Sequence, residues 1–284
     1  MFNKIKKILL HITDRRPVIQ CNVTTLAPNE FLKGRSALIT GGTSGIGYSI
    51  AEAFLKAGAR VIITGRNEER LRSSCSKLSA FGTVSGFVMD NTCVASFEQV
   101  FNEIITELGD TKLSILVNNA GVQGAEFPDA KEKEYDLAMD TNLKACFFLS
   151  QIFGKYMIEN SIKGNILNVC SSSSLRPAIS AYTLSKWGLR GLTLGLAKSL
   201  INHGIVVNGI APGATATPML NKEDKDDLSY VFSPIGRYIL PEEIANMSVF
   251  LVSDMGRSVV GDIVYMTGGM GLITLDDINY NVFK

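Results

Sequence analysis

The stretch that decides the fold is Ala37-Leu38-Ile39-Thr40-Gly41-Gly42-Thr43-Ser44-Gly45-Ile46-Gly47, which runs on into Tyr48-Ser49-Ile50-Ala51-Glu52-Ala53-Phe54. An apolar run of strand length leads into a glycine-rich turn, and the turn leads into a segment with helical periodicity. Glycines in such a turn let backbone N–H groups approach a pyrophosphate, and the start of the helix adds partial positive charge. Because strand, turn and helix occur in this order, we predict a dinucleotide-binding turn.

The same alternation of short apolar runs and amphipathic segments continues along the chain. The expected strands lie at 37–39, 60–64, 86–89, 115–117, 165–169, 205–210 and 263–266. The expected helices lie at 46–57, 67–79, 95–108, 131–159, 180–202 and 241–252. Continuously apolar strands are buried on both faces, and strand–helix alternation produces right-handed crossovers. The sequence therefore predicts an α/β fold, a doubly wound parallel sheet in a single domain.

Length and composition fit one large domain with short ends. The chain has 284 residues, of which 46% are hydrophobic and 19% charged, and this composition argues against a disordered chain. We expect an N-terminal extension over 1–33, the folded domain over 34–271 and a C-terminal tail over 272–284. The formal net charge of +1 gives no support for a nucleic-acid partner. The five cysteines are dispersed without a C-x-x-C pair and there are two histidines, so we expect no metal site and a cytoplasmic protein.

The N-terminal extension has three interpretations. No apolar run reaches the roughly 18 residues of a transmembrane helix, so we expect no membrane span. Phe2, Ile5, Leu9 and Ile12 fall on one helical face beside lysines, which is typical of an amphipathic helix. Such a helix can dock on its own protein or a sister subunit, attach to a membrane surface, or bind another partner. We favour the first of these.

The residues after the second expected strand bear on which dinucleotide binds. An NAD site has an acidic residue there to hold the ribose 2′-hydroxyl, whereas this chain has Gly65-Arg66-Asn67. Gly65 leaves room for a phosphate, and the guanidinium of Arg66 can bind it through two parallel hydrogen bonds. We therefore predict NADP(H) as the cofactor, with NAD as the alternative. The competing interpretation is that Arg66 caps a surface turn or stacks on adenine.

The end of the third expected strand leaves two interpretations open. Asp90 closes the strand and Asn91 follows it. The carboxylate of Asp90 can accept a hydrogen bond from an adenine amino group, or it can cap the helix that begins near Ala95. The sequence alone favours neither.

Tyr182 and Lys186 lie four residues apart in a segment that is expected to be helical. Residues at this spacing share one helix face, so an ammonium group lies close to a phenol. A neighbouring cation favours the phenolate form, which makes such a phenol an effective proton donor and acceptor near neutral pH. Upstream, Asn168-Val169-Cys170-Ser171-Ser172-Ser173-Ser174 ends a buried strand, where α/β proteins bind ligands. A hydroxyl there can hydrogen-bond a substrate oxygen as charge develops on it.

Together these motifs resemble the short-chain dehydrogenases/reductases (SDR family), from about Lys33 to about Gly271. The matching segments occur in order: Thr40-Gly41-x-x-x-Gly45-Ile46-Gly47, Asp90, Asn118-Asn119-Ala120-Gly121, Asn142 within Thr141-Asn142-Leu143, a serine after the fifth strand, Tyr182-x-x-x-Lys186 and Pro212-Gly213-x-x-x-Thr217. The ordered set is far more specific than any one of its parts. The resemblance implies a Rossmann fold and hydride transfer between a nicotinamide and a carbonyl or secondary alcohol.

The resemblance also implies a role for each matching residue. Tyr182 exchanges the proton, Lys186 assists it and holds the nicotinamide ribose, and Asn142 holds a water that links Lys186 to solvent. A serine positions the substrate oxygen; we expect Ser171, although the gap to Tyr182 is shorter than the family's usual one and Ser172 or Ser173 stays open. The expected cofactor-binding residues are Gly41, Thr43, Ser44, Gly45, Ile46, Gly47, Arg66, Asn67, Asp90, Asn91, Asn118, Ala120, Gly121, Tyr182, Lys186, Pro212, Gly213, Thr215 and Thr217.

The substrate is less defined than the chemistry. The expected pocket walls are Leu175-Arg176-Pro177, the stretch 123–127 and the chain after Pro218. The stretch from Met219 to Tyr238, which contains the polar run 221–227, is expected to be a lid over the site, a solvated loop, or both. Arg176 can meet an anionic substrate or can simply be a surface arginine. The resemblance includes enzymes of sugar acids, polyols and 3-oxoacyl thioesters, and it implies a homodimer or homotetramer. The alternative function is a dinucleotide-binding sensor or scaffold with little turnover. Loss of a catalytic residue would favour that alternative, but this sequence retains all of them.

Overall fold

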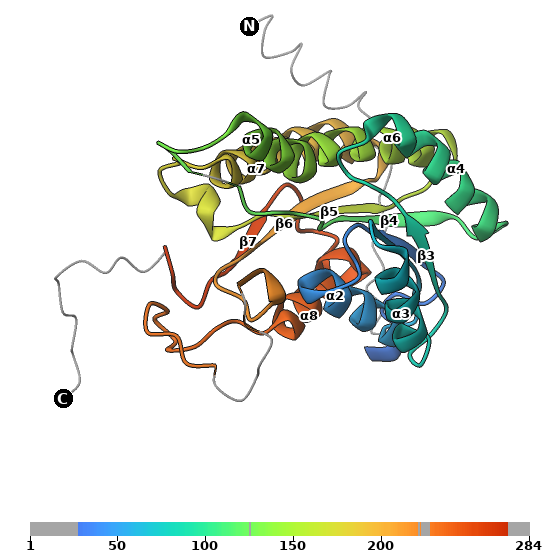
Figure 1. Ribbon diagram of the computed structural model, residues 1–284. Helices are drawn as coiled ribbons and strands as arrows, with labels where there is room; N and C mark the ends of the chain where they lie inside the picture. Colours follow the sequence, from blue (N-terminus) through green and yellow to red (C-terminus); the bar gives the residue numbers. More distant parts are fainter. Residues whose placement is uncertain (1–27, 125, 221, 223–227, 272–284) are drawn as a thin grey trace, which may run out of the picture.

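A seven-stranded parallel sheet forms the centre of the molecule (Figure 1). The computed structural model describes residues 28–124, 126–220, 222 and 228–271. The strand order is β3-β2-β1-β4-β5-β6-β7, and every neighbouring pair is parallel. The strands are β1 (Ser36–Ile39), β2 (Arg60–Gly65), β3 (Val84–Val88), β4 (Leu113–Asn118), β5 (Asn165–Val169), β6 (Val206–Pro212) and β7 (Ile263–Met266).

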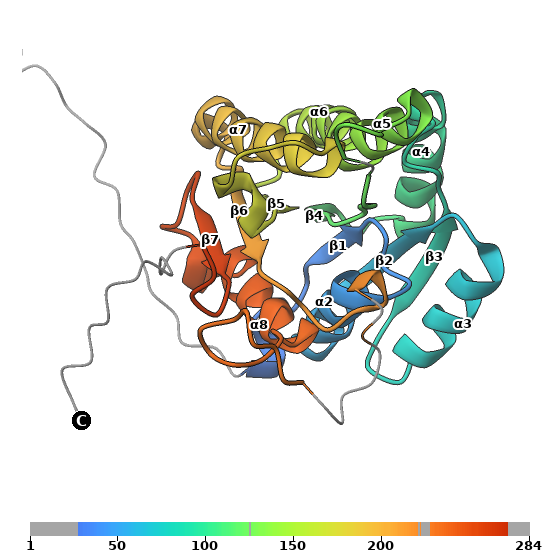
Figure 2. The same cartoon turned by 60° about the vertical axis from the view of Figure 1, so that its left-hand side comes forward.

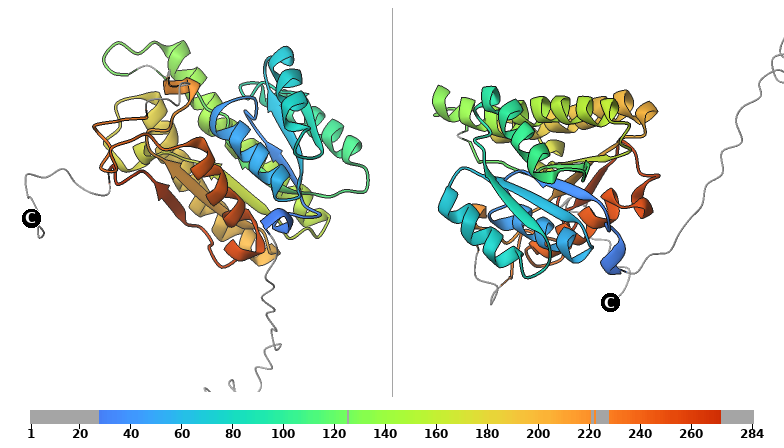
Figure 3. Two further views of the ribbon diagram at one scale, coloured as in Figure 1. Left: turned by 90° about the horizontal axis from the view of Figure 1, so that it is seen from below. Right: turned by 90° about the vertical axis from the view of Figure 1, so that its right-hand side faces the viewer.

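Helices cover both faces of the sheet (Figures 1 and 2). One face carries α4 (Phe97–Leu108), α5 (Glu132–Met139), α6 (Ala145–Glu159) and α7 (Ala181–Leu200). The other carries α2 (Gly45–Lys56), α3 (Glu68–Leu78) and α8 (Pro241–Val252). Two further views show the same three layers from below and from the side (Figure 3). The predicted α/β class and doubly wound parallel sheet are confirmed.

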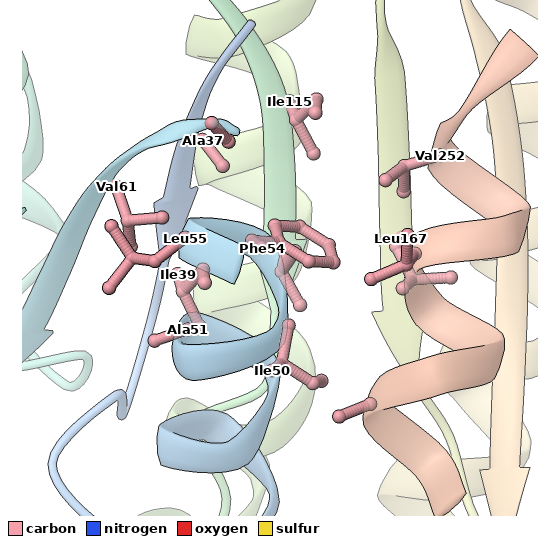
Figure 4. Packing of buried hydrophobic residues seen from close by; sticks show 14 of the residues in the cluster. Ala37, Ile39, Ile50, Ala51, Phe54, Leu55, Val61, Ile115, Leu167 and Val252 are labelled. Carbon is pink, nitrogen blue, oxygen red and sulfur yellow. The ribbon is translucent and has the colours of Figure 1, made fainter. Parts of the chain in front are cut away.

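The two faces of the sheet each have their own hydrophobic core. On the α2/α8 side, Phe54 is fully buried among residues of the sheet and of α8 (Figure 4). On the other side, Phe97 and Phe153 are buried with apolar residues of α4, α6 and the strands. Removing a fully buried phenylalanine ring typically costs about 3–5 kcal/mol. The apolar periodicity of the helices therefore fixes which side of each helix meets the sheet.

The strand order reverses at β1, whose neighbours are β2 on one side and β4 on the other. The crossover from β1 goes through α2 to β2, whereas the chain returns from β3 through α4 to β4 on the opposite side of β1. Ligands of open α/β sheets bind beyond the carboxyl ends of the strands at such a switch point. The loops after β1 and β4 are therefore the first place to look for a site.

The amino ends of the central strands are joined by a half-buried arginine. Arg35, just before β1, donates from Nε to Oγ of Ser114 at 2.9 Å and from Nη2 to Oδ1 of Asn165 at 2.8 Å. It also reaches the carbonyl of Val252 at the end of α8. Burial lowers the pKa of Arg35 from its usual value. One side chain thus joins β1, β4, β5 and α8 at the edge opposite the switch point.

The long helix predicted over 131–159 is divided. A π-helical turn at Asp140–Lys144 separates α5 from α6. Single π turns inside helices are uncommon and occur often at functional sites, and no hydrophobic pattern predicts them. The other predicted elements agree with the structure to within a few residues. Short 3-10 turns lie at Pro28–Glu30, Val94–Ser96, Ser172–Leu175, Ile201–His203, Pro218–Leu220 and Asp254–Gly256.

The packed region begins at least as early as Leu32. Its side chain is fully buried and its N–H donates to the carbonyl of Ala57 at 2.8 Å, so the fold reaches into the stretch 1–33 that was expected to be an extension. The expected amphipathic N-terminal helix and the tail at 272–284 lie outside the described residues, as do residues 221 and 223–227 of the expected lid. None of the described helices is both long enough and apolar enough to span a bilayer.

Candidate active site

A cavity of about 650 Å³ lies at the carboxyl edge of the sheet. Its walls come from the segments after β1, β2, β4, β5 and β6 together with the start of α7. The predicted site residues that line it are Gly41, Thr43, Ser44, Gly45, Ile46, Gly47, Arg66, Asn67, Asp90, Asn91, Ala120, Gly121, Ser171, Tyr182, Lys186, Pro212, Gly213, Thr215 and Thr217. Asn118 and Asn142 are the predicted residues that do not line it.

The turn after β1 has no room for side chains at its glycines. Gly41 has a φ of +65°, and an added Cβ would lie 2.9 Å from Cα of Ala120. A Cβ on Gly47 would collide with Nδ2 of Asn119 and with the carbonyl of Gly41. Ser44 caps α2, yet its side chain makes no hydrogen bond to the helix. The turn therefore holds the helix N-terminus close to the cavity and leaves a hydroxyl and helix N–H groups for an anion.

The end of β2 is crowded by the turn after β1. A Cβ on Gly65 would lie 2.8 Å from Cγ2 of Thr43. Asn67 caps α3 by accepting from the N–H of Arg70 at 2.8 Å. Arg66 and Arg70 both line the cavity, and within the described part of the chain neither forms an ion pair. Two unpaired guanidinium groups thus flank this end of the cavity, and only the first was singled out from the sequence.

Asp90 has a structural partner as well as a place in the cavity wall. Its Oδ1 accepts from both the N–H and the hydroxyl of Thr92 at 2.9 Å, which closes a turn ahead of the 3-10 segment before α4. Asn91 beside it is buried. The carboxylate therefore closes a local turn and faces the cavity without capping α4, whose N-cap is Ser96, so the helix-capping interpretation is wrong and the adenine contact stays a prediction.

The end of β4 corrects one assignment. The side chain of Asn118 points into the core, where Nδ2 donates to Oδ1 of Asn168 at 2.8 Å and to Oγ of Ser150 at 3.0 Å. Asn119 lines the cavity instead and donates to the carbonyls of Thr40 and Gly41. Successive residues of a strand point to opposite faces. Asn118 therefore links β4 to β5 and α6, while Asn119 holds the glycine turn in place.

Tyr182 and Lys186 lie on the cavity side of α7. Nζ of Lys186 is 5.7 Å from the ring centroid of Tyr182 and donates to the carbonyl of Val169 at 2.8 Å. Lys186 is only 4% exposed, although it is a lysine. A buried ammonium needs acceptors, and the structure provides one from the last residue of β5. The lysine is therefore fixed beside the phenol rather than free in solvent.

Asn142 sits in the π-helical turn and is fully buried. Its Oδ1 accepts from the N–H of Val122 at 2.8 Å, and its Nδ2 donates to the carbonyl of Val122 at 2.9 Å and to Oγ of Ser185 at 3.0 Å. A Cβ on Gly121 would lie 3.4 Å from Oδ1 of Asn142 and 3.7 Å from Nζ of Lys186. Asn142 therefore supports the wall next to Lys186 from behind, without lining the cavity.

The four serines after β5 have different positions relative to the cavity. Ser174 is fully buried and donates to the carbonyl of Ser171 at 2.7 Å. Ser171, Ser172 and Ser173 all line the cavity. Oγ of Ser171 accepts from the N–H of Ser173 at 3.1 Å, which orients the oxygen and leaves its hydrogen for another acceptor. This arrangement favours Ser171, among the three, as the serine that positions a substrate oxygen.

Two thiols lie near the lysine. Burial raises the pKa of Cys146 to about 12, and Sγ donates to the carbonyl of Asn142 at 3.2 Å. Burial likewise raises the pKa of Cys170, which lines the cavity, to about 11. Thiols held in the protonated form are poor nucleophiles and poor metal ligands. Among the described residues there is also no cluster of histidine, cysteine and carboxylate side chains that could hold a metal ion.

The wall beyond Tyr182 comes from three segments. Arg176 follows the serine run, and its carbonyl accepts from Nε1 of Trp187 at 2.7 Å. The backbones of Glu126 and Ser180 form an isolated antiparallel β-bridge. Tyr230 stacks on Tyr238 with ring centroids 4.4 Å apart. Sequence reasoning indicated the first two segments and the chain after Pro218 in outline. It missed the individual wall residues Thr183, Tyr230 and Met270, which carry no motif.

The comparison with known proteins agrees with this geometry. The family model described as short chain dehydrogenase matches residues 35–228. The chain belongs to the short-chain dehydrogenase family. The match covers the glycine turn, the Asn-Asn-Ala-Gly segment and the Tyr182/Lys186 pair, so the expected family and its enzymatic, oxidoreductase character are confirmed.

Individual relatives cover nearly the whole folded region. Gluconate 5-dehydrogenase of Gluconobacter oxydans is 36% identical over 247 residues, covering 84% of this chain and 95% of that protein. A 3-oxoacyl-(acyl-carrier-protein) reductase of Rickettsia felis is 34% identical, covering 85% of this chain and 99% of that protein. A solved structure from Beutenbergia cavernae, provisionally described as an NAD(P)-dependent gluconate 5-dehydrogenase with bound NADP, has a TM-score of 0.76 at 30% identity, covering 86% of this chain and all of that one.

Proposed function

We propose that this enzyme transfers a hydride between NADP(H) and a carbonyl or secondary alcohol, with Tyr182 as the proton donor and acceptor. The observation that carries the proposal is that Tyr182, the buried Lys186 and Ser171 line the same cavity as the glycine turn after β1. These residues would hold a dinucleotide, with its phosphates at that turn and its nicotinamide near the three side chains. Asn118, for which the sequence suggested a cofactor contact, is assigned a structural role instead.

Each of the chain's residues has a defined task in this proposal. Ser171 donates its hydroxyl hydrogen to the substrate oxygen, as its contact with Ser173 allows. Tyr182 gives a proton to that oxygen in reduction and removes one in oxidation. Lys186, held by Val169, keeps its amino group beside the phenol and would hold the ribose of a bound nicotinamide. Asn142 acts as a positioning residue for this wall. The cofactor, when bound, supplies or accepts the hydride.

The residues at the far end of the cavity fit NADP(H). Gly65 offers no carboxylate for a ribose 2′-hydroxyl, and Arg66 and Arg70 provide positive charge where a 2′-phosphate would lie. The relatives described above include a structure with NADP bound. A carboxylate at the Gly65 position would favour NAD, and the space there is closed by Thr43.

A cofactor titration tests the first half of the proposal. NADPH and NADH are titrated into the full chain and into Arg66→Ala by following quenching of protein fluorescence. We expect NADPH to bind about 10- to 100-fold more tightly than NADH, the scale of hydrogen bonds to a charged group, and Arg66→Ala to remove most of this difference. Equal binding of the two cofactors by the wild type would overturn the NADP assignment.

A substitution at the acid/base tests the second half. Tyr182→Phe keeps the ring and removes the hydroxyl, so we expect unchanged NADPH affinity and a kcat at least about 100-fold lower over a panel of ketones, keto acids and 3-oxoacyl thioesters. Ser173→Ala is the matched control for Ser171→Ala, and only the latter should lower kcat strongly. Turnover near wild type in Tyr182→Phe would refute the assignment, and no turnover in the wild type would favour a dinucleotide sensor.

We further propose a cytoplasmic homo-oligomer whose folded domain runs from at least Leu32 to about Gly271. Large apolar side chains remain exposed on α6 and α7, including Phe147, Trp187 and Leu194. Burying such side chains against a second copy would stabilise a dimer or tetramer. Light scattering of the purified chain gives the mass directly, and a monomer at micromolar concentration would contradict this part of the proposal.

A further inference from the structure

We propose that Arg176 binds the carboxylate of the substrate, so that the enzyme acts on hydroxylated carboxylic acids rather than on neutral polyols or acyl thioesters. This inference rests on the proposed oxidoreductase function and specifies its substrate class. It starts from the charge of the cavity wall next to Tyr182 and Ser171.

Arg176 is the cation of that wall with no partner of its own. Its guanidinium makes no hydrogen bond and no ion pair to any residue that the structure describes. Four other arginines, Arg60, Arg72, Arg237 and Arg257, form ion pairs with glutamate or aspartate side chains. Lys186, the other cation near Tyr182, already donates to Val169. An unpaired guanidinium facing a cavity is a suitable partner for a carboxylate, which it can bind through two hydrogen bonds.

The position of Arg176 is fixed by its backbone. Its N–H donates to the carbonyl of Ser173 at 3.1 Å, and its own carbonyl accepts from Nε1 of Trp187 on α7. A Cβ on Gly271 would lie 3.8 Å from Nε of Arg176 and 3.9 Å from Nη2, so the guanidinium lies over the backbone that follows β7. The serine run, the helix of Tyr182 and Lys186, and the segment after β7 therefore hold one arginine at the cavity wall.

The remaining groups of this wall suit hydroxyls. Gln123, Glu126, Ser180 and Thr183 line the same cavity. Glu126 forms no ion pair with Arg176 or with any other described residue, and its carboxylate can accept hydrogen bonds from a polyhydroxy chain. In a hydroxy acid the charge lies a few bonds from the reacting carbon, whereas an acyl thioester carries its phosphate many bonds away. A cation on the wall beside the acid/base fits the former.

The test compares ligands that differ only in the carboxylate. D-Gluconate and D-glucitol have the same hydroxylated carbon chain, and C1 is a carboxylate in one and a hydroxymethyl group in the other. Each is titrated by calorimetry into the full chain saturated with NADPH, a complex in which an alcohol cannot react. We expect D-gluconate to bind about 10- to 100-fold more tightly, the range for hydrogen bonds to a charged group. Arg176→Gln should bind the two ligands with equal affinity, and Arg176→Lys should retain part of the preference for D-gluconate.

Arg190→Gln is the matched control. Arg190 lies on α7, stacks on Trp187 at 5.8 Å from its ring centroid and does not line the cavity. The Arg190→Gln variant removes the same charge from the same region, and its ratio of D-gluconate to D-glucitol affinity should stay at the wild-type value. A wild type that binds D-gluconate no better than D-glucitol, or an Arg176→Gln variant that keeps the preference, overturns the inference.

Turnover separates this inference from the proposed function. The kcat/KM for reduction of 5-keto-D-gluconate is compared with that for L-sorbose, its neutral counterpart. Preference for the acid that disappears in Arg176→Gln supports both proposals. Reduction of L-sorbose or of another neutral ketone without preference for the acid refutes the role of Arg176 and leaves the oxidoreductase intact. Binding of D-gluconate through Arg176 without any turnover refutes the oxidoreductase and leaves the anion site.

Discussion

The amide group of Asn142 pairs with both backbone groups of Val122, accepting from its N–H at 2.8 Å and donating to its carbonyl at 2.9 Å. This pairing resembles the bonding between neighbouring strands, although one partner is a side chain inside a helix. The π-helical turn at Asp140–Lys144 brings the amide to the segment after β4. The wall beside Lys186 therefore depends on a residue that the cavity itself does not expose.

Asn142→Asp tests this dependence. The carboxylate can still accept from the N–H of Val122, but it presents lone pairs to the carbonyl of Val122 and cannot donate to Ser185. A buried carboxylate that loses two of the three hydrogen bonds and faces a carbonyl oxygen costs about 3 kcal/mol or more, which corresponds to a Tm lower by roughly 6–12 °C for a domain of this size. Thermal melting by circular dichroism measures it. Asn160→Asp, at an exposed amide at the end of α6, should melt within about 2 °C of wild type. Melting of Asn142→Asp alongside this control would contradict the argument.

Arg35→Met should lower stability without changing catalysis. The substitution leaves Oδ1 of Asn165, Oγ of Ser114 and the carbonyl of Val252 without their shared donor, and we expect a loss of about 2–4 kcal/mol in the free energy of unfolding. Urea denaturation measures the loss, and kcat/KM below the transition should equal that of wild type. Arg257→Met removes an exposed ion pair with Asp254 and should cost no more than about 1 kcal/mol. Equal losses in the two variants would show that the half-buried network contributes little.

Gly65→Ala should weaken cofactor binding through Thr43. The new methyl group would lie 2.8 Å from Cγ2 of Thr43, so the turn after β1 must shift. Overpacking of this kind costs about 1–3 kcal/mol, and a fluorescence titration should show NADPH affinity at least roughly fivefold lower. Thr43→Ser removes the colliding methyl group, so the double variant should bind better than Gly65→Ala alone. Additive losses in the double variant would show that the two residues do not interact.

The cysteines should differ in their reaction with iodoacetamide. Cys93 is exposed, whereas burial raises the pKa of Cys170 to about 11 and that of Cys146 to about 12. At pH 8 only about one Cys170 side chain in a thousand is then a thiolate, the reactive form, and the reactive fraction rises as the pH approaches 11. Mass spectrometry of the native protein should find Cys93 labelled first and Cys146 and Cys170 last. Labelling of Cys170 at the rate of Cys93 would contradict the burial.

The fold could be predicted from the sequence because strands and helices are indicated by the pattern of neighbouring residues. Seven short apolar runs, each separated by a helical pattern, allow few arrangements once crossovers must be right-handed. Helix ends were also predictable where a side chain acts on the neighbouring backbone, as Asn67 does on Arg70. The division of the segment 131–159 was not, because hydrophobic periodicity does not predict a π turn, and the contact it makes between Asn142 and Val122 joins residues 20 positions apart.

The site was predictable where a residue type is required by chemistry, as at Tyr182, Lys186 and Gly41. The site was less predictable where the direction of a side chain determines whether the residue lines the cavity. Asn118 and Asn119 are identical in type, and only the alternation along β4 places one in the core and the other at the cavity. Arg70 and Arg176 belong to no fixed spacing, so their lack of partners becomes visible only when the whole set of ion pairs is known. The roles of these residues stay predictions until the variants above are measured.

The half-buried network around Arg35 has a consequence for how this enzyme can change. It joins four elements at the amino ends of the strands, whereas Arg176, Glu126 and Thr183 stand beyond the carboxyl ends. Mutational libraries aimed at the second group would therefore leave the contacts of Arg35 untouched. Residues that face the substrate can accordingly be varied by laboratory evolution separately from the residues that join the strands.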